Sequence, residues 1–218
     1  LAVISQLQRV SSMLSDEQEN FEARTLHPTH YGRFCPVETP EGTEIGLRKN
    51  LAILSRVSNK LSLDEEHFIK NLEKEGMDRE GSKKIDVFFN GVFIGSADHA
   101  HEFVKKLREK RRNQELPLEM SFRDDPNMQC INISTEPGRV LRPLIIVDGG
   151  VSRLNHEAKL ELEEGKLSWD DLIKKGIIEY LDAAEEENAL VALYENEISH
   201  ENTHLEIDAM DLVGVVTS

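Results

Sequence analysis

Apolar residues in this sequence come in short runs, such as residues 144–147, and no stretch approaches the roughly 18 uninterrupted apolar residues of a membrane span. A run of that size fits a strand and excludes a membrane-spanning helix. Apolar residues make up 39% and charged residues 31% of the 218 positions, which is typical of a folded protein with a polar surface. The length allows one or two cores and excludes a long repeat array.

The charge of the chain is strongly negative and unevenly distributed. Against 26 basic residues stand 41 acidic ones, which gives a formal charge of −15. Residues 1–60 hold equal numbers of acids and bases, so the entire excess lies in residues 61–218. A free-standing nucleic-acid binder normally carries a basic excess. We therefore expect the isolated chain to bind duplex DNA only weakly.

Two cysteines, Cys35 and Cys130, are too few for a disulfide framework in a chain of this size. No basic and apolar leader pattern indicates secretion, so a cytoplasmic location is predicted. The chain begins inside a predicted helix and ends directly after the apolar run 212–216. It therefore reads as a part of a longer protein.

The first quarter alternates helical, loop and strand patterns. Val3, Leu7 and Val10 recur at helical spacing and predict a helix through about residue 12. Residues 14–20 lose that period and predict an exposed loop. Alternating apolar positions in residues 51–57 then predict a strand. A polar stretch over residues 58–84, with a weak helix at 63–72, predicts a boundary near residue 60.

Residues 61–150 read as an α/β unit. Asn90-Gly91 predicts a tight hairpin within residues 87–94. Ser96 or Asp98 is expected to cap a helix that buries Ala100, Phe103, Val104 and Leu107 and ends in the basic residues 110–112. Strands are predicted at 128–134 and 140–147.

Residues 151–218 read as a mainly β unit that opens at the turn formed by residues 148–150. Ser168 is expected to cap a helix through Lys175 that Gly176 terminates. Strands are predicted at residues 177–181, 189–194, 205–207 and 212–216. The predicted fold class is therefore mixed α/β (α+β), with parts at 1–60, 61–150 and 151–218.

The most information-rich segment covers residues 21–51. Its three prolines and its turn residues suit a rigid polar loop better than a core, and such a loop commonly forms a site. The alternative is a solvated connector with accidental charge. Its charged and titratable side chains are Arg24, His27, His30, Arg33, Glu38, Glu41 and Arg48.

Other chemistries have weaker support in this segment. His27, His30 and Cys35 lack a fourth ligand for zinc, so no metal site is predicted. A nucleophilic Cys35 needs a base and an orienting group, and its aromatic and proline neighbours favour burial. The sequence contains neither of the glycine-rich patterns that cradle nucleotide phosphates.

Two charge runs remain. The acids at residues 182 and 185–187 are more typical of solvated surface than of metal ligands. The basic residues between 105 and 112 fit a phosphate site and a helix C-terminus equally well, and this alternative stays open.

Taken together, these motifs resemble a known family. Arg9-Val-Ser-Ser, FEARTLHPTHYGRFCPVETPEG at 21–42 and GLRKNLA at 46–52 resemble the fork region of the second-largest subunit of multisubunit RNA polymerases. VFFNGVFIG at 87–95 and TEPGRVLRPLIIV at 135–147 resemble the first external domain of that subunit. LSWDDL at 167–172 and GIIEYLDAAEEEN at 176–188 resemble its second external domain. The residues of these motifs are most similar to those of archaeal-type B subunits.

The resemblance implies DNA-directed RNA synthesis by a nucleotidyltransferase, in which this subunit forms a wall of the active cleft near downstream DNA and the nucleotide-addition site. It places Arg24, Leu26, His27 and Glu41 beside the cleft. It also implies a fork loop near DNA, which consists of Leu14, Ser15, Asp16, Glu17, Gln18, Glu19 and Asn20.

The resemblance also implies partners and a cofactor. The partners are the other polymerase subunits, template and downstream DNA and nucleoside triphosphates, in a nucleoid-associated cytoplasmic enzyme. Magnesium is expected through the largest subunit, with no metal or other cofactor bound by this chain. The family's own lysines correspond to positions beyond Ser218, so the chain holds no complete catalytic site and is expected to be inactive alone.

One feature departs from a simple DNA-binding expectation. Asp16, Glu17 and Glu19 make the fork loop acidic, which favours a barrier between strands over a phosphate clamp. A competing hypothesis from another class is an acidic, non-catalytic protein-interaction module.

Overall fold

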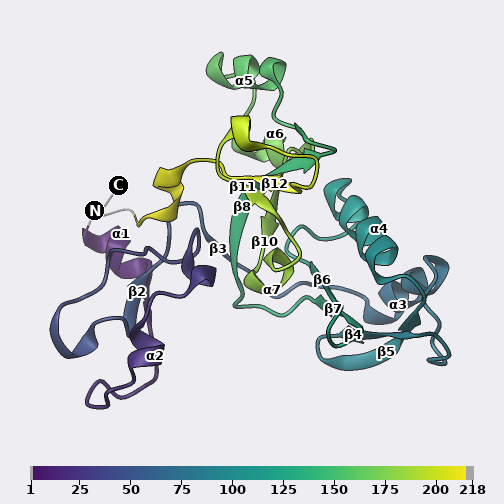
Figure 1. The fold of residues 1–218 in the computed structure, drawn as a ribbon, viewed down its shortest axis with the longest axis horizontal. Coiled ribbons are helices and arrows are strands. Elements are labelled where there is room, and N and C mark those ends of the chain that lie inside the picture. Colours follow the sequence, from purple (N-terminus) through teal and green to yellow (C-terminus); the bar gives the residue numbers. More distant parts are fainter. Residues whose placement is uncertain (1, 215–218) are drawn as a thin grey trace. The chain divides into compact units, whose positions relative to one another are not determined.

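The computed structural model describes residues 2–214, which form two compact units (Figure 1). Unit 1 combines the residues up to Arg56 with Val140–Pro143 and the residues from Ile207 onward. Unit 2 combines Val57–Arg139 with Leu144–Glu206. Within residues 2–214, no helix is both long enough and apolar enough to cross a lipid bilayer.

Unit 1 consists mainly of turns and loops around one small antiparallel sheet. That sheet pairs Arg9 with Asn50 and Ser11 with Arg48. The elements are α1 (Ala2–Leu7), β1 (Arg9–Ser11), α2 (Phe21–Arg24), η1 (Pro28–His30), η2 (Gly42–Glu44), β2 (Arg48–Asn50) and η4 (Ala209–Leu212). The boundary between the units falls within β3 (Arg56–Val57).

Two predictions in unit 1 are corrected. The helix does not continue to residue 12, because the chain leaves α1 after Leu7 and Val10 pairs with Lys49 in the sheet. Of the strand predicted at 51–57, only β3 at residues 56–57 forms, and Leu51 makes an isolated bridge with Phe34. The backbone N–H and the hydroxyl of Ser55 both donate to the Ala52 carbonyl, which closes a turn inside that segment.

The exposed loop over residues 14–20 is confirmed, since it has no helix or strand and its residues through Glu19 are exposed. Apolar burial in unit 1 is small. Its described buried apolar residues are Cys35, Leu47, Ala52 and Leu141. The burial of Cys35 therefore agrees with the sequence prediction.

Unit 2 contains a four-stranded sheet in the order β5-β4-β7-β6, with α3 and α4 packed against it (Figure 1). The strands pair antiparallel except for the parallel pair β4 and β7. These elements are α3 (Glu65–Lys74), β4 (Ile85–Phe89), β5 (Val92–Ala97), α4 (Ala100–Arg112), β6 (Ser121–Asp125) and β7 (Cys130–Ser134).

Several local predictions in this part are confirmed. Asn90 and Gly91 have φ values of 48° and 78° and turn the hairpin between β4 and β5. Phe103, Val104 and Leu107 lie on the buried face of α4 and belong to a hydrophobic core cluster of unit 2. Strand β6 is an addition, because its sequence Ser-Phe-Arg-Asp-Asp carries only one large apolar residue.

The expected cap of α4 is wrong. His99 occupies the N-cap position and makes no side-chain capping hydrogen bond. Ser96 lies within β5, where its hydroxyl accepts from the Lys83 N–H at 2.9 Å. Asp98 pairs instead with the Lys83 ammonium at 2.9 Å.

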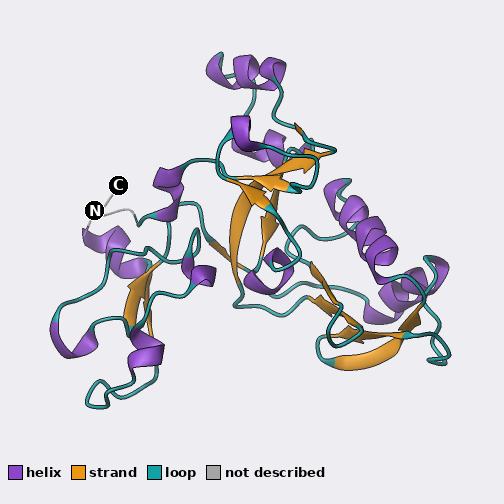
Figure 2. Cartoon of the chain, in the orientation of Figure 1, coloured by secondary structure: helices purple, strands orange, loops and turns teal. Residues whose placement is uncertain are grey.

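The rest of unit 2 surrounds a second sheet in the order β10-β8-β12-β11, with β3 and β9 also paired to β8 (Figure 2). Strands β11 and β12 are parallel, and β12 is antiparallel to β8. The elements are β8 (Val140–Asp148), β9 (Val151–Ser152), α5 (His156–Glu163), α6 (Trp169–Lys174), β10 (Ile178–Leu181), α7 (Ala183–Glu186), β11 (Val191–Ala192), η3 (Glu195–Glu197) and β12 (His204–Leu205).

The Ser168 cap is confirmed, because its hydroxyl accepts from the Asp171 N–H while the Asp171 carboxylate accepts from the Ser168 N–H. Gly176 follows with φ 62°, as a helix-ending glycine should. Helix α5 was not predicted, and the strand expected at 189–194 shrinks to β11. Residue 212 of the last predicted strand lies in η4, and residues 215 and 216 are outside the described residues.

Candidate functional site

The side chain of Arg24 holds two separate loops of unit 1 together. Its Nη1 donates to the carbonyl oxygens of Thr43 at 2.6 Å and Ile45 at 2.9 Å. Its Nη2 donates to the carbonyl oxygens of Asp16 and Gln18, each at 3.1 Å. Both terminal nitrogens of the guanidinium therefore donate to backbone carbonyls. Nη1 bonds the turn of residues 43–45, and Nη2 bonds the loop of residues 14–20.

The turn after Glu41 is also fixed against α2 by its backbone. Gly46 has φ 73°, and a Cβ there would lie 2.3 Å from the Arg24 carbonyl oxygen. Only glycine permits that approach. The Gly46 N–H also donates to the Thr39 hydroxyl at 2.8 Å, and this hydroxyl donates to the Arg48 carbonyl at 3.0 Å. Gly46 and Thr39, which flank this turn, therefore both hold it in place.

Glu41 precedes η2 at its N-cap position, yet its carboxylate makes no capping hydrogen bond. The residue is exposed. Glutamate is not a favoured N-cap residue, and its side chain does not satisfy the free N–H groups of the turn. The carboxylate is therefore available to a group outside this chain.

The side chains of His27 and His30 both accept hydrogen bonds from backbone N–H groups at the η1 turn. The Nδ1 of His27 accepts from the Thr29 N–H at 3.3 Å, and the Nδ1 of His30 accepts from the His27 N–H at 3.2 Å. In the tautomer in which Nδ1 accepts these bonds, a neutral ring carries its proton on Nε2. Burial, Lys49 and His27 together lower the pKa of His30, which favours its neutral form.

The sequence-predicted residues thus fall into two groups. Arg24, the loop of residues 14–20 and the turn after Glu41 are joined through the Arg24 guanidinium. Leu26, which is 48% exposed, and His27 follow α2, and the ring of His27 contacts the η1 turn. The sequence alone identified the residues but not this guanidinium bridge, since its four acceptors are backbone atoms.

The metal and nucleophile alternatives gain no support from geometry. The Sγ of buried Cys35 accepts from the Glu38 N–H at 3.2 Å. Across the described part of the chain, no group of three or more His, Cys, Asp or Glu side chains is placed to hold a metal ion.

The three arginines of the basic run on α4 belong to a buried ion-pair network in unit 2, whereas Lys105 and Lys106 of the same run are exposed. Arg111, only 1% exposed, donates from Nη1 to Glu185 Oε2 at 2.7 Å and from Nη2 to Glu179 Oε2 at 2.7 Å. It also donates to the Met120 carbonyl at 2.6 Å. Position 111 is one turn after Leu107, so it lies on the buried face of α4.

Neighbouring side chains complete the network. Arg108 Nε donates to Glu185 at 2.9 Å, and Arg112 Nη2 donates to Glu179 at 2.6 Å. His204 Nε2 lies 2.8 Å from the same Glu179 carboxylate. These arginines are therefore neutralised inside unit 2 and do not form a phosphate site.

The reading of the acidic run as solvated surface is wrong for two of its members. Asp182 is 5% and Glu185 is 1% exposed. Asp182 caps α7 through the Glu185 N–H and pairs with Arg139 at 2.7 Å. Both acids are buried because the arginines of α4 and the start of β8 supply their counter-charges.

The same network explains the strongest shifts in protonation. Burial raises the pKa of Glu179, but Arg111, His204 and Arg112 lower it more, so the net pKa lies well below the usual value of 4.5. Burial by itself lowers the pKa of Arg111. The charges of Glu185 and Glu179 raise it by more than that, so the net pKa of Arg111 is raised. Both shifts favour the charged forms of Glu179 and Arg111.

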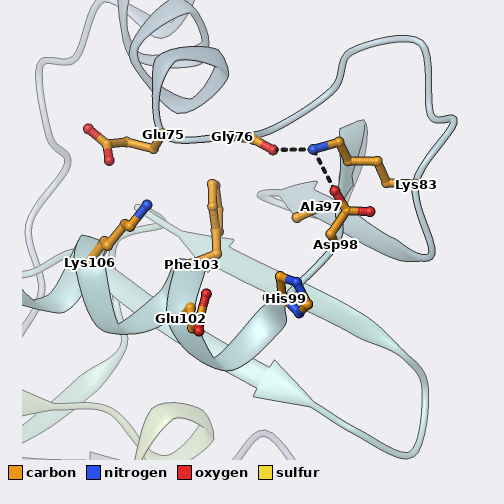
Figure 3. A pocket seen from close by; sticks show the side chains of 9 residues that line it. All are labelled: Glu75, Gly76, Lys83, Ala97, Asp98, His99, Glu102, Phe103 and Lys106. Carbon is orange, nitrogen blue, oxygen red and sulfur yellow. Dashed lines mark hydrogen bonds and ion pairs between the residues drawn. The ribbon is translucent and has the colours of Figure 1, made fainter.

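Figure 3 shows a pocket of about 150 Å³ in unit 2, next to the N-terminus of α4. Lys83 lies at its edge, where its ammonium donates to the Gly76 carbonyl at 3.0 Å and pairs with Asp98. Glu75 and Glu102 also line it. Lys106 and His99 line it as well, and the pocket contains none of the predicted site residues.

Comparisons with known proteins agree with the motifs. Family models described as RNA polymerase Rpb2 domains 3, 4 and 5 match residues 1–57, 87–148 and 169–210. The chain is 38% identical to DNA-directed RNA polymerase subunit Rpo2 of Sulfolobus acidocaldarius, over 100% of this chain and 21% of that protein.

A eukaryotic relative is similar over the same extent. DNA-directed RNA polymerase III subunit RPC2 of Saccharomyces cerevisiae is 34% identical over 99% of this chain and 19% of its own length. The chain thus spans about a fifth of the length of the curated relatives that it matches.

Proposed function

Because the chain belongs to the family of second-largest RNA polymerase subunits, matching its domains 3 to 5, we propose that it works in DNA-templated RNA synthesis as part of the wall of the active cleft. The observation that carries this proposal is the unengaged, exposed carboxylate of Glu41 on a turn that Arg24 holds beside the loop of residues 14–20. Such a rigid polar surface suits a role in positioning substrates.

Phosphoryl transfer depends mainly on the positioning of reactants and on stabilisation of charge, often by metal ions. Under this proposal Glu41 and the Nε2–H donors of His27 and His30 contact nucleotide or nucleic acid, and other subunits supply the magnesium ligands. The loop of residues 14–20 lies near downstream DNA. The partners are the other subunits, DNA and nucleoside triphosphates.

The acidic loop is proposed to act as a barrier and not as a clamp. Asp16, Glu17 and Glu19 are exposed, and carboxylates near DNA phosphates repel them within about a Debye length, roughly 8–10 Å near physiological salt. Neutralising all three acids should therefore lengthen the lifetime of the complex with downstream duplex. The gain should shrink as salt is raised.

The experiment uses an assembled polymerase whose full-length subunit contains this segment. The test variant carries Asp16→Asn, Glu17→Gln and Glu19→Gln, and a charge-matched control carries Glu157→Gln, Glu163→Gln and Glu164→Gln in unit 2. Complex lifetime against salt and single-nucleotide addition are measured, with Glu41→Gln as a further variant. Equal lifetimes at low salt would refute a loop facing DNA, and normal nucleotide addition by Glu41→Gln would refute its place beside the cleft.

The same assay separates the polymerase role from the acidic interaction module. A module that only docks other proteins would tolerate the Glu41 and loop variants without any change in elongation. The purified 218-residue chain should incorporate no nucleotide under either hypothesis, so only the assembled enzyme discriminates between them.

A further inference from the structure

We propose that Arg24 is a positioning residue that couples the loop of residues 14–20 to the turn carrying Glu41, so that the path of the loop sets the place of the Glu41 carboxylate. This inference rests on the proposed function for its consequence in catalysis. Its structural part, the coupling of two segments through one guanidinium, does not depend on that function.

The first support is the geometry of the guanidinium. It is planar and rigid, and its two terminal nitrogens donate to two carbonyls of the loop and two of the turn. A displacement of either segment therefore strains the hydrogen bonds to the other. All four acceptors are backbone oxygens, so the bridge fixes the course of the chain whatever the side chains are.

The second support is that the loop's own hydrogen bonds are long, apart from the one from the Asn20 N–H to the Gln18 carbonyl at 2.9 Å. The N–H of Gln18 donates to the Ser15 carbonyl at 3.4 Å, and the N–H of Glu17 donates to the Ser15 hydroxyl at 3.4 Å. Both distances are long for hydrogen bonds. The two bonds from Arg24, at 3.1 Å, are shorter and come from a charged donor, so they contribute a large share of the order in this loop.

The third support is the short path from the bridge to Glu41. Thr43, whose carbonyl accepts the shortest of the four bonds, is separated from Glu41 only by Gly42. Gly42 has φ 85° and open space around its Cα. The backbone of Gly46 touches that of Arg24 on the other side of the turn. Thr43 and Gly46 therefore anchor this turn to α2, and Glu41 lies two residues before the anchored Thr43.

Arg24 acts through Glu41 and the loop and not on a substrate, because a phosphate could reach its terminal nitrogens only by displacing backbone acceptors. This distinguishes it from an arginine that binds phosphate. Lysine keeps the charge but presents a single ammonium, which cannot span four carbonyls in one plane. Arg24→Lys should therefore behave like Arg24→Gln.

The first test is hydrogen exchange on the assembled polymerase with Arg24→Lys, Arg24→Gln and, as a control, Arg9→Gln. Arg9 is an exposed arginine on β1 of the same unit, so its variant makes the same change in charge. In both Arg24 variants, residues 14–20 and 42–46 should exchange faster together, by about tenfold or more, as expected for loss of charge-assisted hydrogen bonds. Faster exchange in only one segment, or protection by lysine, would overturn the coupling.

The second test measures single-nucleotide addition in a double-mutant cycle. Gln18→Gly loosens the loop, and it should slow addition when Arg24 is present but have little further effect in Arg24→Gln. A departure from additivity of about threefold or more is expected for groups in one network. Additive effects, within about twofold, would contradict the transmission to Glu41.

The two tests separate this inference from the proposed function. Hydrogen exchange decides the bridge without any chemistry. If Glu41→Gln adds nucleotides normally, the proposed function fails while the exchange result still stands. If Glu41→Gln is slow but the double-mutant cycle is additive, the proposed function survives and the positioning role of Arg24 is wrong.

Discussion

At the scale of single residues, a small set of charged side chains is buried or bound within the fold. Arg111 serves two buried carboxylates and a carbonyl, and lies over the Phe122 ring at 5.5 Å. Arg24 serves four carbonyls at the surface of unit 1. The exposed carboxylates of Asp16, Glu17 and Glu41 are the contrasting case, since the fold leaves them to solvent or partners.

Arg111→Met should destabilise unit 2 strongly. The substitution keeps an apolar stem but leaves Glu179 and Glu185 buried without their main counter-charge, and breaking such a pair costs about 3–5 kcal/mol. The control is Arg79→Ala, because the exposed pair of Arg79 with Glu73 is 3.7 Å long and such pairs contribute about 0–1 kcal/mol. Urea unfolding of the purified chain measures both, and equal small losses would show that the network is not needed.

The network also predicts how stability depends on pH. The pKa of Glu179 in the fold lies well below its usual 4.5, so its contribution is complete above about pH 4.5 and is lost as the pH falls through the lower folded value. The lowered pKa of Asp182 acts in the same direction. The unfolding free energy should therefore fall below pH 4.5, with a shallower slope in Glu179→Gln. An unchanged slope in that variant would contradict the assignment.

At the scale of elements, a local hydrophobic pattern did not decide the structure where a neighbouring segment formed backbone hydrogen bonds with the same residues. Val10 fits the helical stripe of α1, yet it pairs with Lys49 because β1 and β2 satisfy each other's backbone groups. Helix α3 shows the opposite case. The Asp64 carboxylate accepts from the His67 N–H at 3.1 Å, so its start follows from a local cap.

The two helices of the larger core provide a matched pair of cap variants. Asp64→Ala should reduce the stability of the chain by about 1 kcal/mol, because it removes an N-cap hydrogen bond. His99→Ala should have a smaller effect, since His99 makes no side-chain cap for α4. Chemical denaturation and hydrogen exchange of residues 65–74 test this. Equal losses in the two variants would mean that the Asp64 cap contributes nothing specific.

At the scale of the whole molecule, the two units differ in how much apolar surface they bury. Unit 2 has a continuous core of 13 buried residues, which come from α3, α4, all four strands of its first sheet and the loop residues Met77 and Met120. Unit 1 buries few apolar side chains and leaves large ones exposed, among them Val3 at 69%, Leu7 at 80%, Met13 at 105% and Phe21 at 70%.

Unit 1 should therefore open before unit 2 in the purified chain and become protected in the assembled polymerase. Burial of apolar surface provides most of the stability of a domain, and unit 1 buries little of its own. Hydrogen exchange compared between the isolated chain and the assembled enzyme tests this, with residues 85–107 as the internal reference for unit 2. A single common opening of both units in the isolated chain would refute it.

Local chemistry in the sequence determined several elements and the location of the candidate site. The Asn90-Gly91 hairpin, the Ser168 cap and the buried face of α4 each depend on residues within one turn or one helix, so the sequence could specify them. The polar segment 21–51 was likewise recognisable from its own composition. The three-part division at residues 60 and 150 stays a prediction.

Only the tertiary structure decided which charges are buried and what Arg24 holds. Glu185 and Arg111 lie 74 positions apart, and neither local period nor composition indicates that they meet. The acceptors of Arg24 are backbone carbonyls, which every residue possesses, so no side-chain pattern could single them out. A contact between distant segments depends on the path of the backbone, and that path is set by the packing of the whole unit.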